Sequence, residues 1–443
     1  MRPRCRRARP NLKERGVCLI DTVAAFKQTA ADLLNNPDDA KALVGRQLLA
    51  SGDNDSRSAL NLSLARRAVE LMPNRFETVF NLGSALMRDQ RYDESVAVFI
   101  RALELAPASH KAITLHHVGL AYGDCGLFTE ARAAYDEALR MDLDSPTIHH
   151  SIAIEKLNTG LLRDGLYDFE VTHHVPPRKA ISASGIPRWK GEPLVGKTII
   201  MAHEQGFGDT IQFCRVIPLL KAKKVILSGP PVLTGLIADN LKVDEVIDEA
   251  GPFAADYVCS PMSALACLGL NYPAICGQPY INAHKLKLPD RGKLKVGIVW
   301  RGSPGYARNM DRSLTIEQLA PCFEIPRLAF YSLQVGENAA DVAKAGLSGF
   351  VADLTVTIKD WRDTARAIAA MDVIVSVDTA TAHLAGAMGK PTLILLPFSC
   401  CWRWMRNAPM TPWYNSVRLF RQHVAGNWQH PIAKLANELR AMT

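Results

Sequence analysis

The strongest constraint on the fold is a strand, a tight turn and a helix that follow one another late in the chain. Residues 372–377 form a mostly apolar, β-branched run, which predicts a buried parallel strand. Asp378 and Thr379 stand where a helix should begin, and both residue types cap helices. His383 lies one helical turn after Thr379, so both side chains are expected to face one ligand. With the next predicted strand at residues 392–396, this unit places free N–H groups at the carboxyl edge of a sheet, where phosphate binds.

Strands and helices alternate through the rest of the C-terminal part. This alternation predicts parallel sheets covered by helices on both faces, and a linker-like segment at residues 285–293 separates two series. We therefore predict two Rossmann-like α/β domains, at residues 187–288 and 293–443, with a ligand cleft at the carboxyl ends of their strands. The predicted strands are 197–201, 224–228, 245–247, 257–258, 295–300 and 328–333, and the predicted helices are 209–220, 231–240 and 361–371.

A different periodicity marks residues 21–178, which precede a break rich in Pro, Ser and Gly. Gly126 and Gly160 are 34 residues apart, which indicates a repeat of this length, and helix starts are predicted at Asn81 and Tyr92. The pattern resembles tetratricopeptide repeats, with two clear copies and about two degenerate ones; a plain helical bundle is the alternative. Such repeats usually bind a peptide or protein segment in a concave groove, and a structural or dimerising role is the alternative. The predicted fold class is thus α + α/β, with helical repeats followed by two α/β domains.

Basic residues are concentrated in a short N-terminal arm. The chain carries a formal charge of +8, but residues 1–15 hold six Arg, one Lys and one Glu, so only +2 remains for the rest. We therefore expect a disordered arm at residues 1–20, or a wrongly assigned start of the chain, with a functional basic tail as the alternative, and no nucleic-acid-binding body. No apolar run approaches ~20 residues, so no transmembrane segment is predicted. The ten scattered Cys, without a C-x-x-C pair, favour reduced thiols and a cytoplasmic location.

The first predicted strand of the first α/β domain ends in a Gly-rich turn. Gly206 and Gly208 allow a sharp bend and the close approach of a ligand, and Asp209 follows them at the mouth of the cleft. Two interpretations of Asp209 stay open. It either caps the next helix, or it acts as a general base that takes a proton from an acceptor hydroxyl.

The second α/β domain carries polar loops at the same edge of its predicted sheet. The loop at residues 301–313 is Gly-rich and contains Arg308 and Arg312, which suit a diphosphate because guanidinium groups bind phosphate oxygens in pairs. A solvated loop is the alternative. Gln334 ends the following strand and is a candidate hydrogen-bond partner of a ribose or base. The segment 397–404 contains two Trp, which either cover a sugar or base, or belong to the core.

Four segments of the chain resemble those of one enzyme family. They are residues 203–209, 296–300, 311–313 and 378–383. Together they resemble the ADP-heptose–lipopolysaccharide heptosyltransferases, which are glycosyltransferase family 9-like enzymes, and their bacterial relatives fused to tetratricopeptide repeats. The resemblance covers about residues 187–430, and the Asp-Thr-x-x-x-His element is its most specific part.

This resemblance implies a two-domain glycosyltransferase of the GT-B type, with an acceptor-side N-terminal domain and a nucleotide-sugar-binding C-terminal domain. It implies that Asp209 is the base, and that Arg312, near the family's phosphate-contacting Lys, helps to neutralise the donor diphosphate. The sequence departs from the family at Ala380, where heptosyltransferases usually have Gly, so the donor sugar stays open. The residues that match the family's diphosphate-binding turn are Asp378, Thr379, Ala380 and His383.

The leading hypothesis is a metal-independent glycosyltransferase that moves a sugar from a nucleotide-diphosphate sugar to an unknown glycan or protein, without a cofactor. No Asp-x-Asp pair follows residue 187 to hold a cation, and a helix dipole with Arg can stabilise a leaving diphosphate. Asp209 is expected to serve the acceptor, whereas Thr379 and His383 serve the donor, and the repeats bind a partner or the acceptor. The alternative is a repeat scaffold whose transferase-like domain is catalytically silent.

Overall fold

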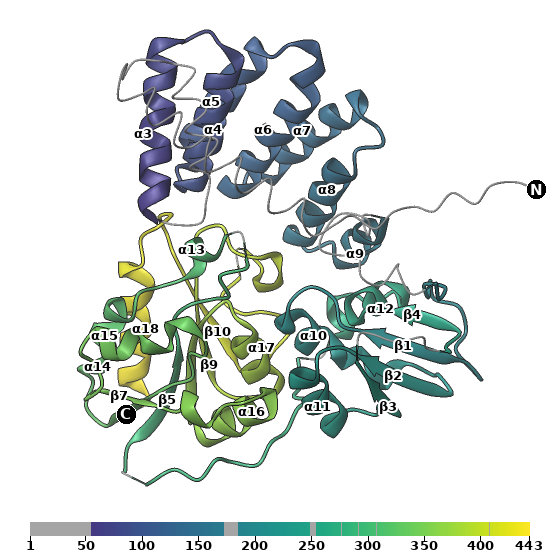
Figure 1. The fold of residues 1–443 in the computed structure, drawn as a ribbon, viewed down its shortest axis with the longest axis vertical. Helices are drawn as coiled ribbons and strands as arrows, with labels where there is room; N and C mark the ends of the chain where they lie inside the picture. The colour runs from purple at the N-terminus through teal and green to yellow at the C-terminus, as the bar shows by residue number, and fades with distance from the viewer. Residues whose placement is uncertain are drawn as a thin grey trace, which may run out of the picture. The chain divides into compact units, whose positions relative to one another are not determined.

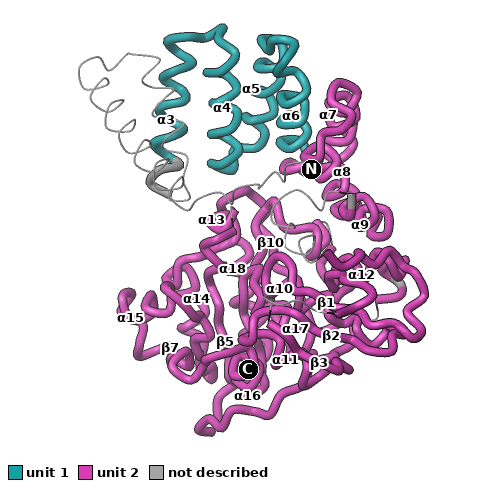
Figure 2. Tube along the Cα trace, turned by 45° about the vertical axis from the view of Figure 1, so that its right-hand side comes forward, with its two compact units in different colours: residues 1–122 teal, residues 123–443 magenta. Residues whose placement is uncertain are grey.

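The computed structural model describes most of the chain. The basic arm, the first part of the predicted repeats and most of the break before residue 185 lie outside the described residues. By its internal contacts the chain divides into two compact units, residues 1–122 and 123–443 (Figure 2). The described residues are 55–171, 185–248, 254–275, 277–290, 292–306, 308–406 and 408–443.

The chain is helical from residue 55 to residue 171 (Figure 1). In this part α4 packs against α5, and α8 packs against α9. Gly126 and Gly160, 34 residues apart, follow the ends of two helices with φ of +84° and +88°, a conformation that glycine adopts most easily. The helices are α3 (Asp55–Leu71), α4 (Phe76–Arg88), α5 (Tyr92–Leu105), α6 (Lys111–Cys125), α7 (Phe128–Met141), α8 (Pro146–Asn158) and α9 (Leu162–Val171).

The helix pair α4–α5 shows how small residues serve the repeats. Gly83 lies against the buried ring of Phe99, where a Cβ atom would come within 2.8 Å of the ring carbons. The predicted helix start at Asn81 is wrong, because α4 already begins at Phe76. Asn81 and Gly83 lie inside the helix, so this motif reports helix packing rather than a helix boundary. The partner helix begins at Tyr92, as predicted.

The first α/β domain is built on a sheet of four parallel strands among the described residues. The strand order is β3-β2-β1-β4. The helix predicted at 209–220 is split: α10 ends at Phe213, and a 3-10 helix, η3, continues over Pro218, which lacks the N–H for an α-helical bond. The elements are β1 (Thr198–Ala202), α10 (Phe207–Phe213), η3 (Cys214–Leu219), β2 (Lys224–Ser228), α11 (Pro231–Asn240), β3 (Glu245–Ile247), β4 (Tyr257–Cys259) and α12 (Pro261–Cys267).

The second α/β domain holds six parallel strands in the part that the structure describes, in the order β10-β9-β8-β5-β6-β7. Both edge strands escaped prediction, because β7 has three residues and β10 places two Arg among its apolar residues. The strands are β5 (Leu294–Val299), β6 (Leu328–Ser332), β7 (Val351–Asp353), β8 (Val373–Val377), β9 (Thr392–Leu396) and β10 (Val417–Arg421). The helices are α13 (Asn309–Arg312), α14 (Ala320–Phe323), α15 (Asp341–Lys344), α16 (Trp361–Ala370), α17 (Ala380–Ala387) and α18 (Gln429–Ala441).

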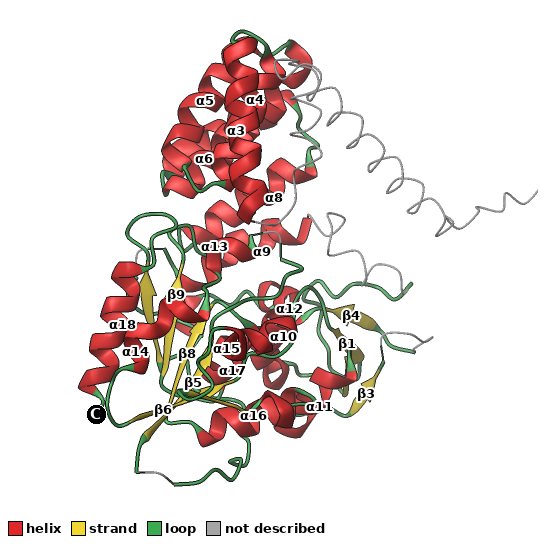
Figure 3. Ribbon diagram, turned by 60° about the vertical axis from the view of Figure 1, so that its left-hand side comes forward, coloured by secondary structure: helices red, strands yellow, loops and turns green. Residues whose placement is uncertain are grey.

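Helices followed by two parallel sheets confirm the predicted fold class (Figure 3). The two α/β domains share one hydrophobic core, in which Met201 and Ile211 of the first domain join Leu384 of the second. Helix α10 packs against α17 (Figure 1), and a Cβ atom on Gly208 would lie 3.3 Å from the Cα atom of Ala380. The loops that carry the candidate residues of both domains therefore meet. The exact domain boundaries stay a prediction.

Replacing Gly386 with Ala should destabilise the protein. A Cβ atom there would lie 2.5 Å from the fully buried ring of Tyr414. Displacing a packed ring costs about 1–3 kcal/mol, which exceeds the gain of up to ~1 kcal/mol in helix propensity. Urea unfolding followed by circular dichroism should give a lower midpoint. In Gly123→Ala, the matched control, the nearest atom is 3.8 Å away, so the midpoint should hold or rise; an unchanged Gly386→Ala midpoint would contradict this packing.

Candidate functional site

The turn after β8 brings backbone donors to the carboxyl edge of the second sheet. Thr379 is the N-cap of α17: its side-chain Oγ1 accepts the N–H of Ala382 over 3.3 Å, and its carbonyl accepts the N–H of His383 over 3.2 Å. The first N–H groups of a helix have no partner within the helix, and this applies to those of Ala380 and Thr381. A capped helix start with free amides is suited to an anion.

His383 lies beneath this turn rather than at its surface. Its side chain is buried and stacks on Trp404, with ring centroids 4.7 Å apart, while its Nδ1 lies 3.0 Å from the Tyr414 hydroxyl. Burial, followed by the charges of nearby arginines with Arg403 foremost, holds the pKa of His383 well below its usual range. The imidazole is therefore neutral near pH 7, and it supports the start of α17 from within.

Arg312 stands beside the start of α17. Its Nη1 lies 3.7 Å from Oδ2 of Asp378, and its guanidinium lies 4.3 Å from the centroid of the Tyr306 ring. The side chains of this ion pair are 15% and 13% exposed. An ion pair of this length is loose, so N–H groups of Arg312 can turn to phosphate oxygens without leaving the site.

Asp209 has partners from both α/β domains. Its Oδ2 accepts the N–H of Gly206 over 3.0 Å, which caps α10, and its Oδ1 forms an ion pair with Arg403 from the loop after β9. The capping interpretation is therefore confirmed, and the general-base role stays a prediction. The sharp bend of this turn falls on Gln205, with φ of +64°, rather than on Gly206 or Gly208.

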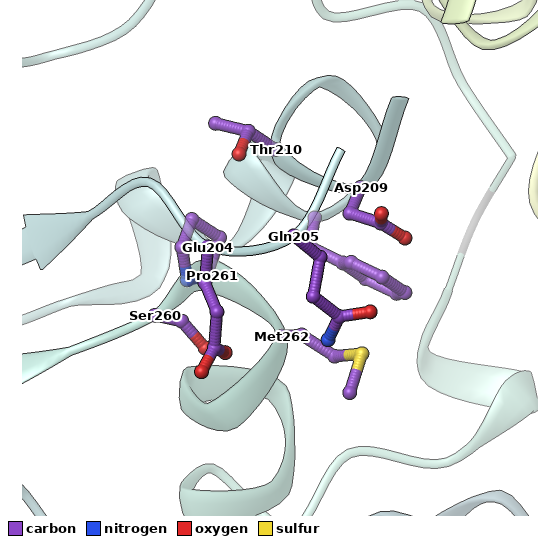
Figure 4. A pocket seen from close by; sticks show the side chains of 8 residues that line it. Glu204, Gln205, Asp209, Thr210, Ser260, Pro261 and Met262 are labelled. Carbon is purple, nitrogen blue, oxygen red and sulfur yellow. The ribbon is translucent and has the colours of Figure 1, made fainter. Parts of the chain in front are cut away.

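A small pocket, with room for about one water molecule, lies beside Asp209 (Figure 4). In Figure 4 the side chains of Gln205, Asp209 and Met262 lie to the right of those of Glu204 and Ser260. Polar and apolar side chains share its wall, so the pocket suits a single hydroxyl group rather than a whole ligand. The residues that line the pocket are Glu204, Gln205, Asp209, Thr210, Phe213, Ser260, Pro261 and Met262.

Other residues singled out in the sequence have structural partners. The Oε1 atom of Gln334 accepts the N–H groups of Trp300 and Arg301, over 3.1 Å and 2.8 Å, and so shapes the loop after β5. Trp402 and Trp404 are 4% and 0% exposed, so the core interpretation of these two residues is confirmed.

Arg308 is bound by two carboxylates. Its Nε donates to Asp311 over 2.8 Å and its Nη1 donates to Asp124 over 2.7 Å. Asp124, which belongs to α6, also accepts the hydroxyl of Ser399 over 2.5 Å. A helix of the repeat region thus ties together the loops after β5 and β9. The sequence did not indicate Asp124 or Arg403, because their partners lie 184 and 194 positions away.

In the ranges that the structure describes, no helix is long and apolar enough to cross a membrane. The same ranges hold no group of three or more His, Cys, Asp or Glu placed to bind a metal ion. None of the seven cysteines in the described ranges forms a disulfide.

The buried His383 should make stability fall in acid. Because its pKa is lowered in the folded state, the unfolded chain binds more protons below about pH 6.5, and stability drops by up to ~1.4 kcal/mol per pH unit as pH falls from there. His383→Gln keeps a polar partner for Tyr414 but cannot titrate. Urea unfolding between pH 5 and 8 should show a shallower pH dependence for this variant. The exposed His284→Gln is the control; equal slopes for His383→Gln and the wild type would contradict the assignment.

Comparisons with known proteins identify the helical region. The tetratricopeptide-repeat family model matches residues 75–144. Protein FlbA of Caulobacter vibrioides is 22% identical over 447 aligned residues, which cover 83% of this chain and 73% of FlbA. A thermophilic tetratricopeptide-repeat protein of Thermus thermophilus, whose structure is solved, is 21% identical with a TM-score of 0.31. The match covers 38% of this chain and 89% of the Thermus chain.

MamA of Desulfovibrio magneticus RS-1, solved from residue 41 to the end, is 16% identical with a TM-score of 0.32. The match covers 37% of this chain and 91% of the MamA chain. The family match carries the assignment of the helices. The chain therefore consists of a tetratricopeptide-repeat region followed by parallel α/β sheets, and it is a distant homologue of FlbA.

Proposed function

We propose that this protein is a glycosyltransferase that moves a sugar from a nucleoside-diphosphate sugar to a hydroxyl group of a glycan or protein. The observation that carries the proposal is the start of α17. The capping Thr379, the first helical amides after it and the adjacent Arg312 lie together at the carboxyl edge of the six-stranded sheet. This edge is where parallel α/β sheets bind nucleotides, and the arrangement suits a diphosphate.

The donor is assigned to the second α/β domain. The amides of Ala380 and Thr381 receive the diphosphate oxygens, and Arg312 neutralises their charge. Thr379 holds the turn through its cap, and the neutral His383 fixes the helix start through Trp404 and Tyr414. Because arginine and the helix start take the charge of the leaving group, the proposal assigns no metal to this chain's reaction.

The acceptor is assigned to the pocket beside Asp209. In the proposed step the acceptor O–H gives its proton to the Asp209 carboxylate while the acceptor oxygen bonds to the anomeric carbon of the sugar. The bond from this carbon to the diphosphate oxygen breaks, and its electron pair leaves on the nucleoside diphosphate. The contact of α10 with α17 supports this division, because it sets the pocket next to the proposed donor site.

The repeats are assigned to a protein or peptide partner. Tetratricopeptide repeats present an extended surface to such segments, and the partner is either the acceptor itself or an anchor. The bonds of Asp124 to Arg308 and Ser399 support a link between the repeat region and the loops that flank the donor site.

A second candidate is a repeat scaffold with a silent transferase-like domain. The ion pair of Asp209 with Arg403 favours it, since a base held by a buried guanidinium is not free to act. The two candidates differ in whether the chain binds nucleotides.

Arg312→Gln should weaken the binding of nucleoside diphosphates by roughly 10- to 100-fold, since a hydrogen bond to a charged group contributes about 1.5–3 kcal/mol. Calorimetric titration of the wild type with ADP, UDP and GDP provides the reference. Arg418→Gln is the matched control, because Arg418 lies in the same domain but pairs with Glu438 at the surface. Absence of binding by the wild type would favour the scaffold; equal binding by the wild type and Arg312→Gln would remove Arg312 from the donor site.

Asp209→Asn should lower sugar transfer by roughly 10²–10⁴-fold, the usual contribution of a general base. Asn keeps the size of Asp and an oxygen for the N–H of Gly206, so the cap of α10 should survive. A thermal-shift screen of nucleotide sugars identifies the donor, and a screen for sugar transfer identifies the acceptor. Turnover is then measured with this pair of substrates. Asp360→Asn, which changes the capping Asp of α16, controls for lost capping. Near-normal transfer by Asp209→Asn would exclude Asp209 as the base.

A further inference from the structure

Arg403 has more hydrogen-bond donors than good acceptors around it. A guanidinium carries five N–H groups. Within the described residues, the oxygen atom that accepts a hydrogen bond from Arg403 belongs to Asp209. Its other contacts are with sulfur: Cys401 Sγ at 3.1 Å and Met262 Sδ at 3.8 Å. The Nε atom is buried without a partner. Because sulfur accepts hydrogen bonds weakly, this guanidinium has capacity for further oxygen atoms.

The position of Arg403 joins the two proposed half-sites. On one side it contacts Asp209 and Met262, which line the pocket. On the other side the next residue, Trp404, stacks on His383 beneath the start of α17. Burial opposes the charge of Arg403, yet its pKa is raised overall by neighbours that include the carboxylates of Asp209 and Asp378. Arg403 therefore lies within the electrostatic reach of both half-sites.

Two arginine–carboxylate pairs thus flank the start of α17. Arg403 pairs with Asp209, and Arg312 pairs with Asp378. Each carboxylate supplies the negative charge that a buried guanidinium needs. A diphosphate brings the same kind of charge on more oxygen atoms, and phosphate oxygens match the fork of guanidinium donors. Carboxylate and diphosphate are therefore competitors for the same arginine.

We propose that Arg403 is a ligand of the donor diphosphate, and that Asp209 competes with the diphosphate for it. Donor binding then moves the guanidinium from Asp209 to the phosphate oxygens and frees Oδ1 of Asp209 for the acceptor hydroxyl. This inference rests on the proposed glycosyl transfer. The proton and electron pair follow the path given above, with Arg403 and Arg312 together holding the charge of the leaving nucleoside diphosphate. The donor therefore binds before the acceptor can be activated.

Competition predicts a gain of binding that independent sites do not. If Asp209 served the acceptor alone, Asp209→Asn would leave donor affinity unchanged. Under competition, Asp209→Asn removes the rival anion, and inorganic pyrophosphate, ADP, UDP and GDP should bind about tenfold more tightly, or about 1.4 kcal/mol. Arg403→Gln should bind them at least tenfold more weakly. Adding Asp209→Asn to Arg403→Gln should change affinity little, since the arginine that Asp209 masks is then absent.

The measurement is calorimetric titration of the full chain, with folding checked by circular dichroism and gel filtration. Asp360→Asn, at the N-cap of α16, is the control for an Asp-to-Asn change in a helix cap and should bind like the wild type. Asp209→Asn leaves Arg403 unpaired, so its melting temperature should fall, but pyrophosphate should raise it more than in the wild type. If Arg403→Gln does not fold, Arg403→Lys, which keeps the charge but loses the fork, replaces it in the cycle.

The outcomes separate the two proposals. If Asp209→Asn binds the anions no more tightly than the wild type, Asp209 does not compete for Arg403. The same holds if Asp209→Asn still raises the affinity when Arg403 is absent. Either result overturns the competition between Asp209 and the diphosphate but leaves the proposed glycosyltransferase unaffected. Absence of pyrophosphate and nucleotide binding by every variant overturns both. A gain that depends on Arg403 supports the inference.

Discussion

The close approach of α10 to α17 is the contact on which the geometry of the candidate site depends. Gly208 has no side chain, and a Cβ atom there would meet the ring of His383 at 3.0 Å and the Cα atom of Ala380 at 3.3 Å. This approach sets Asp209, one residue further along α10, beside a guanidinium from the other domain. The first domain's carboxylate and the second domain's helix start therefore belong to one cluster of charges.

That cluster is costly to bury, which is itself informative. Taking an ion pair out of water costs free energy that mutual attraction repays only with good geometry, so a buried pair is weak evidence for stability. The Arg403–Asp209 pair is mostly buried, and the guanidinium keeps an Nε donor without a partner. The His383 side chain beneath the pair is neutral and adds no competing charge.

The repeat region is joined to this cluster through its polar contacts. Asp124 accepts hydrogen bonds from Arg308 and Ser399, and the guanidinium of Arg406 donates to the carbonyls of Gly123 and Asp124. The two loops involved follow β5 and β9, which place Arg312 and Arg403. The end of α6 therefore contacts both arginine-bearing loops.

Local pattern in the sequence determined the repeat spacing, the parallel character of both sheets and the cap of α17 by Thr379, because each depends on residues within one or two elements. Edge strands were harder, since β10 carries two Arg that interrupt its apolar pattern. Only the tertiary structure decided which polar residues became ligands of one another. Gln334 accepts hydrogen bonds from the loop after β5, and Asp209 pairs with Arg403 from the other domain. Such pairs join residues far apart in the chain, and their energy depends on burial and distance, which no local pattern encodes.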